Sequence, residues 1–466
     1  MKIRVFRHYV HAPVWILALV EGVIFFASIY VGAELRFLEF SGAGIEDLGP
    51  LYPRAIILTV TMFVVLTSMG LYRSDMKLED RSYLSLFTIA YSIGFLSITA
   101  LFYMFPSLHL GRGVLGIAFL LAALASAITR YIFVHLQDNT STKRRILVLG
   151  TGSRAARIAE IAKQKNDDNR FHLVGFVERG TEDNEIDEHL LLPRNTPLIA
   201  LARKYNVDEI VVGVRQRRGG NSSMDELLEC RMEGIRVTDL SSFFERETGK
   251  VQLESLNPSW IVYCEGFNRS DIRNIVKRMF DVIVSLVLLL LTLPVMVLTA
   301  ILIKLESRGP VFYRQRRVGE CGHPFDVIKF RSMRTDAEVD GKPQWAKTND
   351  NRVTRVGWLI RKLRIDELPQ IINVIKGDMS FVGPRPERPY FINQLAESIP
   401  YYLTRHSVKP GITGWAQVRY PYGASVEDAK QKLQYDLYYA KNHTLFLDLV
   451  ILFETAQVVL FGKGAR

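Results

Sequence analysis

Cysteine is scarce in this chain of 466 residues, which holds three: Cys230, Cys264 and Cys321. They are far apart in sequence, with none of the short spacings found in zinc sites or disulfide-rich domains. So low a cysteine content is typical of proteins that fold in a reducing compartment. The sequence therefore predicts neither structural disulfides nor a zinc centre.

Charged residues are equally scarce in four stretches before residue 137. These apolar stretches cover roughly 13–33, 51–72, 83–105 and 114–134. Each approaches or exceeds the ~20 residues that a helix needs to cross a bilayer. The first stretch lacks a small-residue cleavage site, so we expect a retained anchor and not a signal peptide. The sequence thus predicts a membrane protein that begins with a four-helix transmembrane bundle.

Charges between these stretches predict the orientation of the bundle. Basic residues lie before the first stretch, between the second and third, and after the fourth: Lys2, Arg4, Arg7, Arg73, Lys77, Arg81, Lys143, Arg144 and Arg145. Acidic residues follow the first stretch: Glu34, Glu39, Glu46 and Asp47. Because positive segments stay inside, both ends of the bundle are predicted to be cytoplasmic. Glu21, within the first stretch, is either functional or faces a helix partner or the interface.

Residues 143–240 alternate strand-like and helix-like segments, a pattern typical of a parallel α/β sheet. Gly150 and Gly152 begin a G-x-G-x-x-A motif directly after the first strand, and Glu178 ends the second strand. This arrangement matches a dinucleotide fingerprint, but the tight turn of a Rossmann-like scaffold needs the same glycines. No recognisable substrate-side catalytic residues follow, so we favour the scaffold and do not expect NAD or another nucleotide. Residues 241–272 are expected to form a linker with a small β element.

A fifth apolar stretch, residues 280–303, is also long enough to span a membrane. Both flanks are basic, which places both in the cytoplasm: Arg273, Lys277, Arg278, Lys304, Arg308 and Arg314. Pro294, near the middle, removes a helical hydrogen bond. A re-entrant helix bent at Pro294 is therefore favoured over an ordinary fifth span. Lys277, Arg278 and Asp281 are then expected at headgroup level, where the cations could hold a lipid phosphate.

Two adjacent carboxylates, Asp366 and Glu367, stand at the head of the stretch RIDELPQIINVIKGD. Asp366 is predicted to cap an apolar helix that has Pro369 in its first turn and stops at Gly377. Capping alone explains most such Asp residues. At a helix N-terminus, however, the carboxylate would be kept ionised and able to attack phosphorus. Two adjacent carboxylates also suit Mg²⁺, whose remaining ligands would be substrate phosphate oxygens.

The surroundings of this dyad are strongly basic. Residues 308–364 hold 14 Lys and Arg against 6 Asp and Glu, which fits a face on anionic lipid or a pocket for a polyanionic substrate. Lys329 and Arg331 follow a short predicted strand, and Arg385 lies in the proline-stiffened loop FVGPRPERP. A rigid loop that presents guanidinium groups suits contacts to phosphate. The residues alone therefore predict a phosphoryl transferase at a membrane surface and leave its substrate unnamed.

Several runs occur in a fixed order within residues 273–466: KRMFD, GPVFYRQRRVG, PFDVIKFRSM, IRKLRIDELPQIINVIKGDMSFVGPRPE and KPGITGWAQV. Together they closely resemble the bacterial sugar transferase family, the monotopic phosphoglycosyl transferases. The four spans and the α/β middle also resemble the long form of this family. Its members are undecaprenyl-phosphate glucose or galactose phosphotransferases, which begin exopolysaccharide and O-antigen synthesis.

The resemblance implies transfer of a sugar-1-phosphate from a UDP-sugar to undecaprenyl phosphate, with Mg²⁺, release of UMP and a covalent aspartyl intermediate. It implies Asp366 as the nucleophile and Glu367 in a metal or proton-transfer role. The candidate substrate-binding residues are Lys329, Arg331, Arg361, Arg385, Glu387 and Asp436. Arg364 and Ile365 stand where the family often has Ser-Leu, a difference expected to alter local charge without abolishing activity. Arg385 could instead be a structural partner of Glu387.

The expected fold is a membrane protein of α plus α/β class. Its predicted parts are four transmembrane helices (1–137), a Rossmann-like cytoplasmic domain (143–240), a linker (241–272) and a monotopic catalytic domain (273–466) with a re-entrant helix at about 276–305. The expected location is the bacterial inner membrane, with the catalytic domain on the cytoplasmic face, lipids as partners and no nucleic acid. A homodimer would fit the long form. The alternative function is a membrane-anchored, nucleotide-sensing regulatory or scaffold protein, against which the intact dyad and G-P-R-P loop speak.

Overall fold

The computed structural model describes residues 2–5, 8–38, 49–72, 81–108, 110–137, 143–164, 171–179, 184–214, 221–255, 271–334, 352–421, 423 and 425–461. These divide into two compact units, the first holding most of the chain up to Phe243 and the second holding Phe244 onward. Several residues used in the predictions lie outside the described ranges: Arg7, Glu39, Glu46, Asp47, Arg73, Lys77, Cys264 and residues 256–270 of the expected linker.

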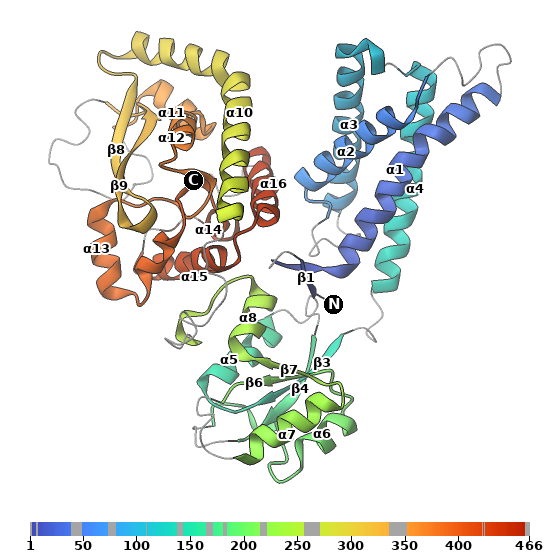
Figure 1. The fold of residues 1–466 in the computed structure, drawn as a ribbon, viewed down its shortest axis with the longest axis vertical. Helices are drawn as coiled ribbons and strands as arrows, with labels where there is room; N and C mark the ends of the chain where they lie inside the picture. Colours follow the sequence, from blue (N-terminus) through green and yellow to red (C-terminus); the bar gives the residue numbers. More distant parts are fainter. Residues whose placement is uncertain are drawn as a thin grey trace. The chain divides into compact units, whose positions relative to one another are not determined.

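Four helices form the N-terminal part of the first unit (Figure 1). They are α1 (Ala12–Leu38), α2 (Tyr52–Ser68), α3 (Arg81–Met104) and α4 (Arg112–Gln137), with strands β1 (Lys2–Val5) and β2 (His8–His11) before α1 and the 3₁₀ turn η2 (Pro106–Leu108) before α4. Among the described residues, four stretches are long and apolar enough to cross a membrane. Three lie in these helices, Trp15–Phe37, Tyr83–Met104 and Arg112–Phe133, and the fourth, Asp271–Glu306, lies in the second unit. The predicted second span is a helix of 17 residues. It is shorter than expected because Gly70, with φ of +78°, turns the chain just beyond its end.

The four helices bury one face against one another and expose apolar side chains on the other. Phe25, Leu58 and Ala118 are at most 1% exposed, whereas Leu19 and Leu96 are 70% and 67% exposed. Exposed leucines of this kind are expected where helices face lipid, because lipid tails are as apolar as the side chains. Together with the lengths of α1, α3 and α4, this supports a membrane protein.

The rest of the first unit is a five-stranded parallel sheet with the order β5-β4-β3-β6-β7 (Figure 1). Its strands are β3 (Arg144–Leu149), β4 (Phe171–Val177), β5 (Leu191–Leu192), β6 (Glu209–Val212) and β7 (Arg236–Asp239), and its helices are α5 (Ser153–Gln164), η4 (Glu188–Leu190), α6 (Leu198–Lys204) and α7 (Asn221–Met232). Leu147 and Ile210, on neighbouring strands, are fully buried. The predicted parallel α/β sheet is therefore confirmed.

The start of the expected linker is helical. Residues Leu240–Thr248 form α8, and Leu253–Ser255 form the 3₁₀ turn η5. Phe243 and Phe244 within α8 are fully buried, and an aromatic pair that packs into a core favours an ordered helix over a linker. Up to Ser255, where the described part of this segment ends, the expected β element is not found.

The second unit begins with the long helix α10 (Asp271–Glu306), which a β hairpin and a set of short helices follow. The later elements are β8 (Phe312–Val318), η7 (Glu320–Gly322), β9 (Pro324–Phe330), α11 (Arg355–Lys362), η8 (Ile365–Glu367), α12 (Gln370–Lys376), β10 (Ser380–Val382), α13 (Pro389–Ser398), η9 (Tyr402–Ser407), β11 (Gly411–Thr413), α14 (Trp415–Arg419), α15 (Val426–Asn442) and α16 (Leu445–Phe461). Strands β10 and β11 pair in parallel. Leu437, Leu447 and Ile451 of α15 and α16 are fully buried and anchor the core of this unit.

Helix α10 has 36 residues with Pro294 inside it, and its ribbon turns sharply along its length (Figure 1). Near its start, Asp281 Oδ1 accepts a hydrogen bond from the backbone N–H of Phe381 at 3.1 Å. At its end, Glu306 Oε1 accepts one from the N–H of Arg355 at 2.7 Å. Leu290, between these ends, is 73% exposed. Both ends of the apolar helix thus contact the same unit, and its middle is uncovered.

Candidate active site

The strand that carries Lys329 is fixed by a buried amide. Asn373 of α12 is 1% exposed. Its Nδ2 donates to the carbonyl of Asp326 at 2.8 Å, and its Oδ1 accepts from the N–H of Ile328 at 3.0 Å. These bonds hold β9 against the helix that follows the acidic dyad. Sequence reasoning missed Asn373, although a lone amide within the apolar run IINVI was a signal for it.

The dyad lies in η8, between α11 and α12, and the prediction that Asp366 caps the following helix is wrong. Helix α12 begins at Gln370, with Pro369 in the capping position. Proline has no N–H, so the hydrogen bond that would extend the helix back toward Ile365 cannot form. The chain instead makes a 3₁₀ turn that follows Arg364, whose φ is +59°. Gly377, with φ of +97°, ends α12 as predicted.

Glu367 accepts two charged hydrogen bonds on one oxygen. Lys329 Nζ lies 2.8 Å from Oε1 and Arg385 Nη2 lies 2.7 Å from the same atom, while the Glu367 side chain is 13% exposed. Burial tends to raise the pKa of Glu367, but Arg385 and Lys329 outweigh it and hold the pKa well below the usual range. Burial lowers the pKa of Lys329, although Glu367 opposes this effect. Glu367 is therefore an ionised anchor for two cations.

Asp366 is in a different electrostatic position from its neighbour. Burial raises its pKa above the ordinary value, the charge of Glu367 raises it further, and Lys329, Arg361 and Arg364 oppose the rise. The helix N-terminus that was expected to keep Asp366 ionised is not found at this residue, because α12 begins at Gln370. Within the described part of the chain, no group donates a hydrogen bond to its carboxylate. Asp366 is therefore a comparatively basic carboxylate with both oxygens available for chemistry.

Arg385 is tied to the dyad and not to Glu387. Its side chain reaches Glu367, whereas Glu387 Oε2 lies 3.4 Å from Nη1 of Arg317. Arg317 also donates to the carbonyl of Pro386 at 3.0 Å. The pairing of Arg385 with Glu387, considered as a structural alternative, is not found. Sequence reasoning missed Arg317, which holds this loop against β8.

Asp436 lies behind the loop and does not contact the dyad. It is 2% exposed, and its Oδ2 lies 2.8 Å from Nη2 of Arg405. Arg405 in turn donates to the main-chain carbonyl of Arg385 at 2.9 Å. The structure thus connects Asp436 with Arg385 through a buried guanidinium that sequence reasoning did not single out.

Two further candidate arginines differ in whether they act on the dyad. Arg331 is 6% exposed and donates to the carbonyls of Ser307 and Arg308 at 2.9 and 3.0 Å, so its guanidinium closes the turn after α10. Arg361, in α11, is near enough to lower the pKa of Asp366. Of these two, Arg361 belongs to the electrostatic environment of the dyad.

The three residues expected at lipid headgroups have partners within the second unit. Lys277 Nζ lies 2.6 Å from Oδ2 of Asp448, a fully buried carboxylate of α16. Arg278 donates to the last carbonyls of α12, at Val374 and Ile375, over 2.5 and 2.6 Å. Asp281 holds the N–H of Phe381. These side chains join α10 to α12, β10 and α16.

In the first unit, the glycine turn of the candidate nucleotide motif packs against the segment that follows β6. Gly150 has φ of +115°, and a β-carbon there would lie 3.2 Å from the backbone nitrogen of Val214. Glu178 pairs with Arg194 at 3.2 Å, both partly exposed. Gly150 therefore serves the close approach of the segment after β6, and Gly152 lies in the same turn before α5. This favours the interpretation of the motif as a packing feature.

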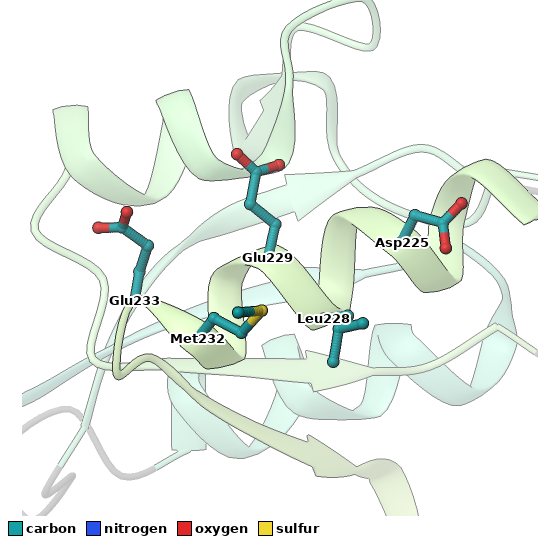
Figure 2. Close-up of a pocket in the computed structure, with 5 residues that line it drawn as sticks. All are labelled: Asp225, Leu228, Glu229, Met232 and Glu233. Atoms are coloured by element: carbon teal, nitrogen blue, oxygen red, sulfur yellow. The ribbon is translucent and has the colours of Figure 1, made fainter.

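A surface cavity of about 510 Å³ lies on α7, away from the dyad in sequence and in the other unit. Figure 2 shows its lining residues, Asp225, Leu228, Glu229, Met232 and Glu233, along that helix. The lining carries acids and no cation, so it does not suit a phosphate group.

The two carboxylates of the dyad differ in how many of their oxygens already have partners, which bears on binding of a divalent cation. Among the described residues there is no group of three or more His, Cys, Asp or Glu side chains that could hold a metal ion. Mg²⁺ commonly takes one or two carboxylates and completes its shell with substrate phosphates and water. Asp366 fits this role, whereas Oε1 of Glu367 already accepts from Lys329 and Arg385.

Comparison with known proteins gives a consistent result. The model for the family "Bacterial sugar transferase" matches residues 272–462. A UDP-N-acetylgalactosamine-undecaprenyl-phosphate N-acetylgalactosaminephosphotransferase of Aeromonas hydrophila is 45% identical over 240 residues, 52% of this chain and 56% of the relative. An undecaprenyl-phosphate glucose phosphotransferase of Komagataeibacter xylinus is 35% identical over 329 residues, 69% of this chain and 60% of the relative. The chain thus spans less than two thirds of the length of both relatives.

A shorter relative is covered more fully. A UDP-glucose:undecaprenyl-phosphate glucose-1-phosphate transferase of Caulobacter vibrioides is 41% identical over 191 residues, 41% of this chain and 71% of the relative. The apolar helices and the cation-clamped dyad define a membrane protein with a site suited to phosphate groups. The chain belongs to the bacterial sugar transferase family.

Proposed function

We propose that this protein transfers a sugar-1-phosphate from a UDP-sugar to undecaprenyl phosphate, the priming step of exopolysaccharide or O-antigen assembly. The observation that carries the proposal is the contrast within the dyad. Glu367 is ionised and pairs with Lys329 and Arg385, while Asp366 beside it has a raised pKa and accepts no hydrogen bond from the described residues. The names of the relatives support a nucleotide sugar and undecaprenyl phosphate as substrates, but they differ in the sugar. We therefore propose a UDP-hexose or a UDP-N-acetylhexosamine as the donor.

The proposed reaction has two displacement steps at one phosphorus. A carboxylate oxygen of Asp366 attacks the phosphorus that bears the sugar, and the bond from that phosphorus to the UMP oxygen breaks, so UMP leaves with the bonding electrons. An oxygen of undecaprenyl phosphate then attacks the same phosphorus. This second step breaks the bond to Asp366, restores its carboxylate and yields undecaprenyl-diphosphate-sugar. The raised pKa of Asp366 suits a nucleophile, because a more basic carboxylate donates its electrons more readily.

The cations around the dyad have a binding role in this scheme. Lys329 and Arg385 meet on one oxygen of Glu367, and both have donors suited to phosphate oxygens. We propose that they bind the diphosphate of the UDP-sugar and stabilise the charge that builds up on the leaving UMP. Mg²⁺ would be held by Asp366 with the substrate phosphates, and when bound it would neutralise phosphate charge.

We further propose that α10 enters one leaflet and returns, so that the second unit stays on the cytoplasmic face of the inner membrane. A straight helix of 36 residues would extend about 54 Å, well beyond the ~30 Å hydrocarbon core. Its two ends contact the two helices that flank η8: Arg278 reaches the end of α12, and Glu306 reaches the start of α11. A helix with both ends on one unit and an exposed apolar middle is best accommodated by re-entry at Pro294.

The parallel sheet of the first unit is proposed to be a Rossmann-like scaffold without a bound nucleotide. Numbered along the chain, its strands stand in the order 3-2-1-4-5, which is that of doubly wound nucleotide-binding folds. The approach of Val214 to Gly150 accounts for the glycine without a cofactor. The alternative, a nucleotide-sensing regulatory or scaffold protein, would not explain why Lys329 and Arg385 both pair with Glu367.

The test is UMP release by detergent-purified protein given a panel of UDP-sugars, undecaprenyl phosphate and Mg²⁺. We expect repeated turnover to UMP with at least one UDP-sugar, dependent on both the lipid and Mg²⁺ and absent from Asp366→Asn. Glu397→Gln, which changes an exposed acid of α13, is the control and should retain activity. If folded wild-type protein releases no UMP from any sugar, the transferase proposal fails and the regulatory alternative is favoured.

A further inference from the structure

A buried guanidinium connects α15 with the loop that presents Arg385. Arg405 is 5% exposed and lies in η9. Its Nη2 lies 2.8 Å from Oδ2 of Asp436 and donates to the main-chain carbonyl of Arg385 at 2.9 Å. Its Nη1 donates to the hydroxyl of Tyr402 at 3.0 Å. One side chain thus holds an acid, a phenol and the backbone of the loop at the same time.

Burial makes this arrangement costly unless every part of it is present. A buried cation without its counter-charge destabilises a protein strongly, whereas a pair with good geometry is tolerated. Asp436, 2% exposed, supplies the counter-charge. Both terminal nitrogens of the guanidinium have partners, Nη1 at Tyr402 and Nη2 at Asp436 and the Arg385 carbonyl. Its Nε is buried and has no hydrogen-bond partner among the described residues. Rotation of the guanidinium would therefore break the contacts of both terminal nitrogens. The backbone at Arg385 is therefore attached to a rigid point inside the unit.

Arg385 is held both at its main-chain carbonyl and at its side chain. The carbonyl of Arg385 accepts from Arg405, and the side chain of Arg385 donates to Oε1 of Glu367 at 2.7 Å. The flanking prolines limit the loop further, since each fixes its own φ. The contact with Arg405 thus constrains the backbone from which the Arg385 side chain extends.

We propose that Arg405, held in place by Asp436, is a positioning residue that fixes the backbone at Arg385 so that its guanidinium reaches Glu367. Asp436 then acts through Arg405 and does not touch the substrate. The kinetic part of this inference rests on the proposed transferase function. The structural part does not, because it concerns the order of one loop.

The structural test is amide hydrogen exchange on the full-length protein in detergent. Asp436→Asn keeps the shape of the side chain and removes its charge, and Arg405→Lys keeps the charge and loses the forked geometry. Both should raise the exchange rate of a peptide covering residues 381–388, by about tenfold or more. The matched control is Glu245→Gln, which breaks another buried ion pair on α15, that of Glu245 with Lys441 at 2.7 Å. If both test variants leave this peptide at the wild-type rate, the inference is overturned whatever the enzyme does.

The kinetic test is a double-mutant cycle. If Asp436→Asn acts only by displacing Arg385, adding it to Arg385→Ala should cost no more than about threefold in kcat/KM, although alone it costs tenfold or more. Glu245→Gln should instead combine additively with Arg385→Ala. Additive losses for Asp436→Asn would mean a contact of its own with substrate and would overturn the positioning role. Absence of turnover in the wild type would count against the transferase proposal, and the exchange measurement would still decide this inference.

Discussion

Lys329 Nζ lies 2.8 Å from Oε1 of Glu367, and this contact joins the β hairpin to the turn that carries the dyad. Both side chains are largely buried, at 20% and 13% exposure. In such surroundings an ion pair interacts more strongly than it does in water. The pair holds a cation close to Asp366 without neutralising Asp366 itself. That separation of roles within two adjacent carboxylates is the basis of the mechanism proposed here.

Replacing Lys329 should reduce turnover. We expect Lys329→Met to lower kcat/KM by about 100-fold, as seen when one preorganised donor to a developing charge is removed. Steady-state UMP release measures this. Lys376→Met, at an exposed site at the end of α12, is the control and should stay within about threefold of wild type. A Lys329 variant as active as the control would contradict the binding role.

The pH dependence of activity should depend on Glu367. Its charge raises the pKa of Asp366, whereas Lys329 lowers it. Glu367→Gln removes the first effect and leaves Lys329 unneutralised, so both changes lower the pKa of Asp366. Since kcat/KM reports the free enzyme, its acid limb should move to lower pH, on top of a loss of rate. An acid limb that stays in place or moves upward would contradict Asp366 as the titrating nucleophile.

The stability of the second unit should fall in mild acid because of His406. Burial, with the charge of Arg405 adding to it, lowers the pKa of His406 to about 4. Between about pH 6.5 and 4 the unfolded chain therefore binds a proton that the folded protein does not, so stability is lost as the pH falls through this window. The loss is roughly 3 kcal/mol at most. Thermal unfolding of wild type and His406→Gln across this range should show a flatter profile for the variant, and parallel profiles would refute this assignment.

Glu21 should matter for the stability of the helical bundle and not for catalysis. Its carboxylate is fully buried and accepts from Arg130 Nη2 at 2.8 Å and from Tyr72 at 2.6 Å. Of the two readings of this residue, the helix partner is therefore the one supported. Glu21→Gln should destabilise the protein by about 3–5 kcal/mol, because it leaves Arg130 buried without a counter-charge.

The double variant Glu21→Gln/Arg130→Gln is the control, and it should recover part of that loss. Thermal unfolding in detergent measures both, together with UMP release per folded molecule. A Glu21→Gln protein of wild-type stability that has lost activity would show that the acid has a functional role instead.

The sequence predicted those features that one segment contains by itself. The dyad, the G-P-R-P loop and the end of α12 at Gly377 were found in this way, because each depends on neighbouring residues. The start of α12 was predicted wrongly, because Asp366 is a residue type favoured at helix caps, whereas the missing N–H of Pro369 delays the helix to Gln370. Likewise, the run of apolar residues predicted a second membrane span over 51–72, but α2 ends at Ser68 because the chain turns at Gly70.

Features that depend on pairing between distant segments were not predictable. Nothing in the local sequence indicates that Arg405 joins Asp436 to Arg385, or that Asn373 holds β9. Burial also reversed the expected direction of the Asp366 pKa, because desolvation depends on the folded surroundings. The chemistry of the site could thus be proposed from motifs, while its electrostatics required the structure.

The most direct test of the central claim is a single-turnover experiment without lipid acceptor. Wild-type protein is mixed with the active UDP-sugar, and both UMP and the mass of the peptide containing Asp366 are measured. We predict a burst of about one UMP per active site and a sugar-phosphate adduct on Asp366, both absent from Asp366→Asn. Undecaprenyl phosphate should then remove the adduct as undecaprenyl-diphosphate-sugar and allow UMP release to continue. Turnover with lipid but neither burst nor adduct without it would contradict Asp366 as a covalent nucleophile.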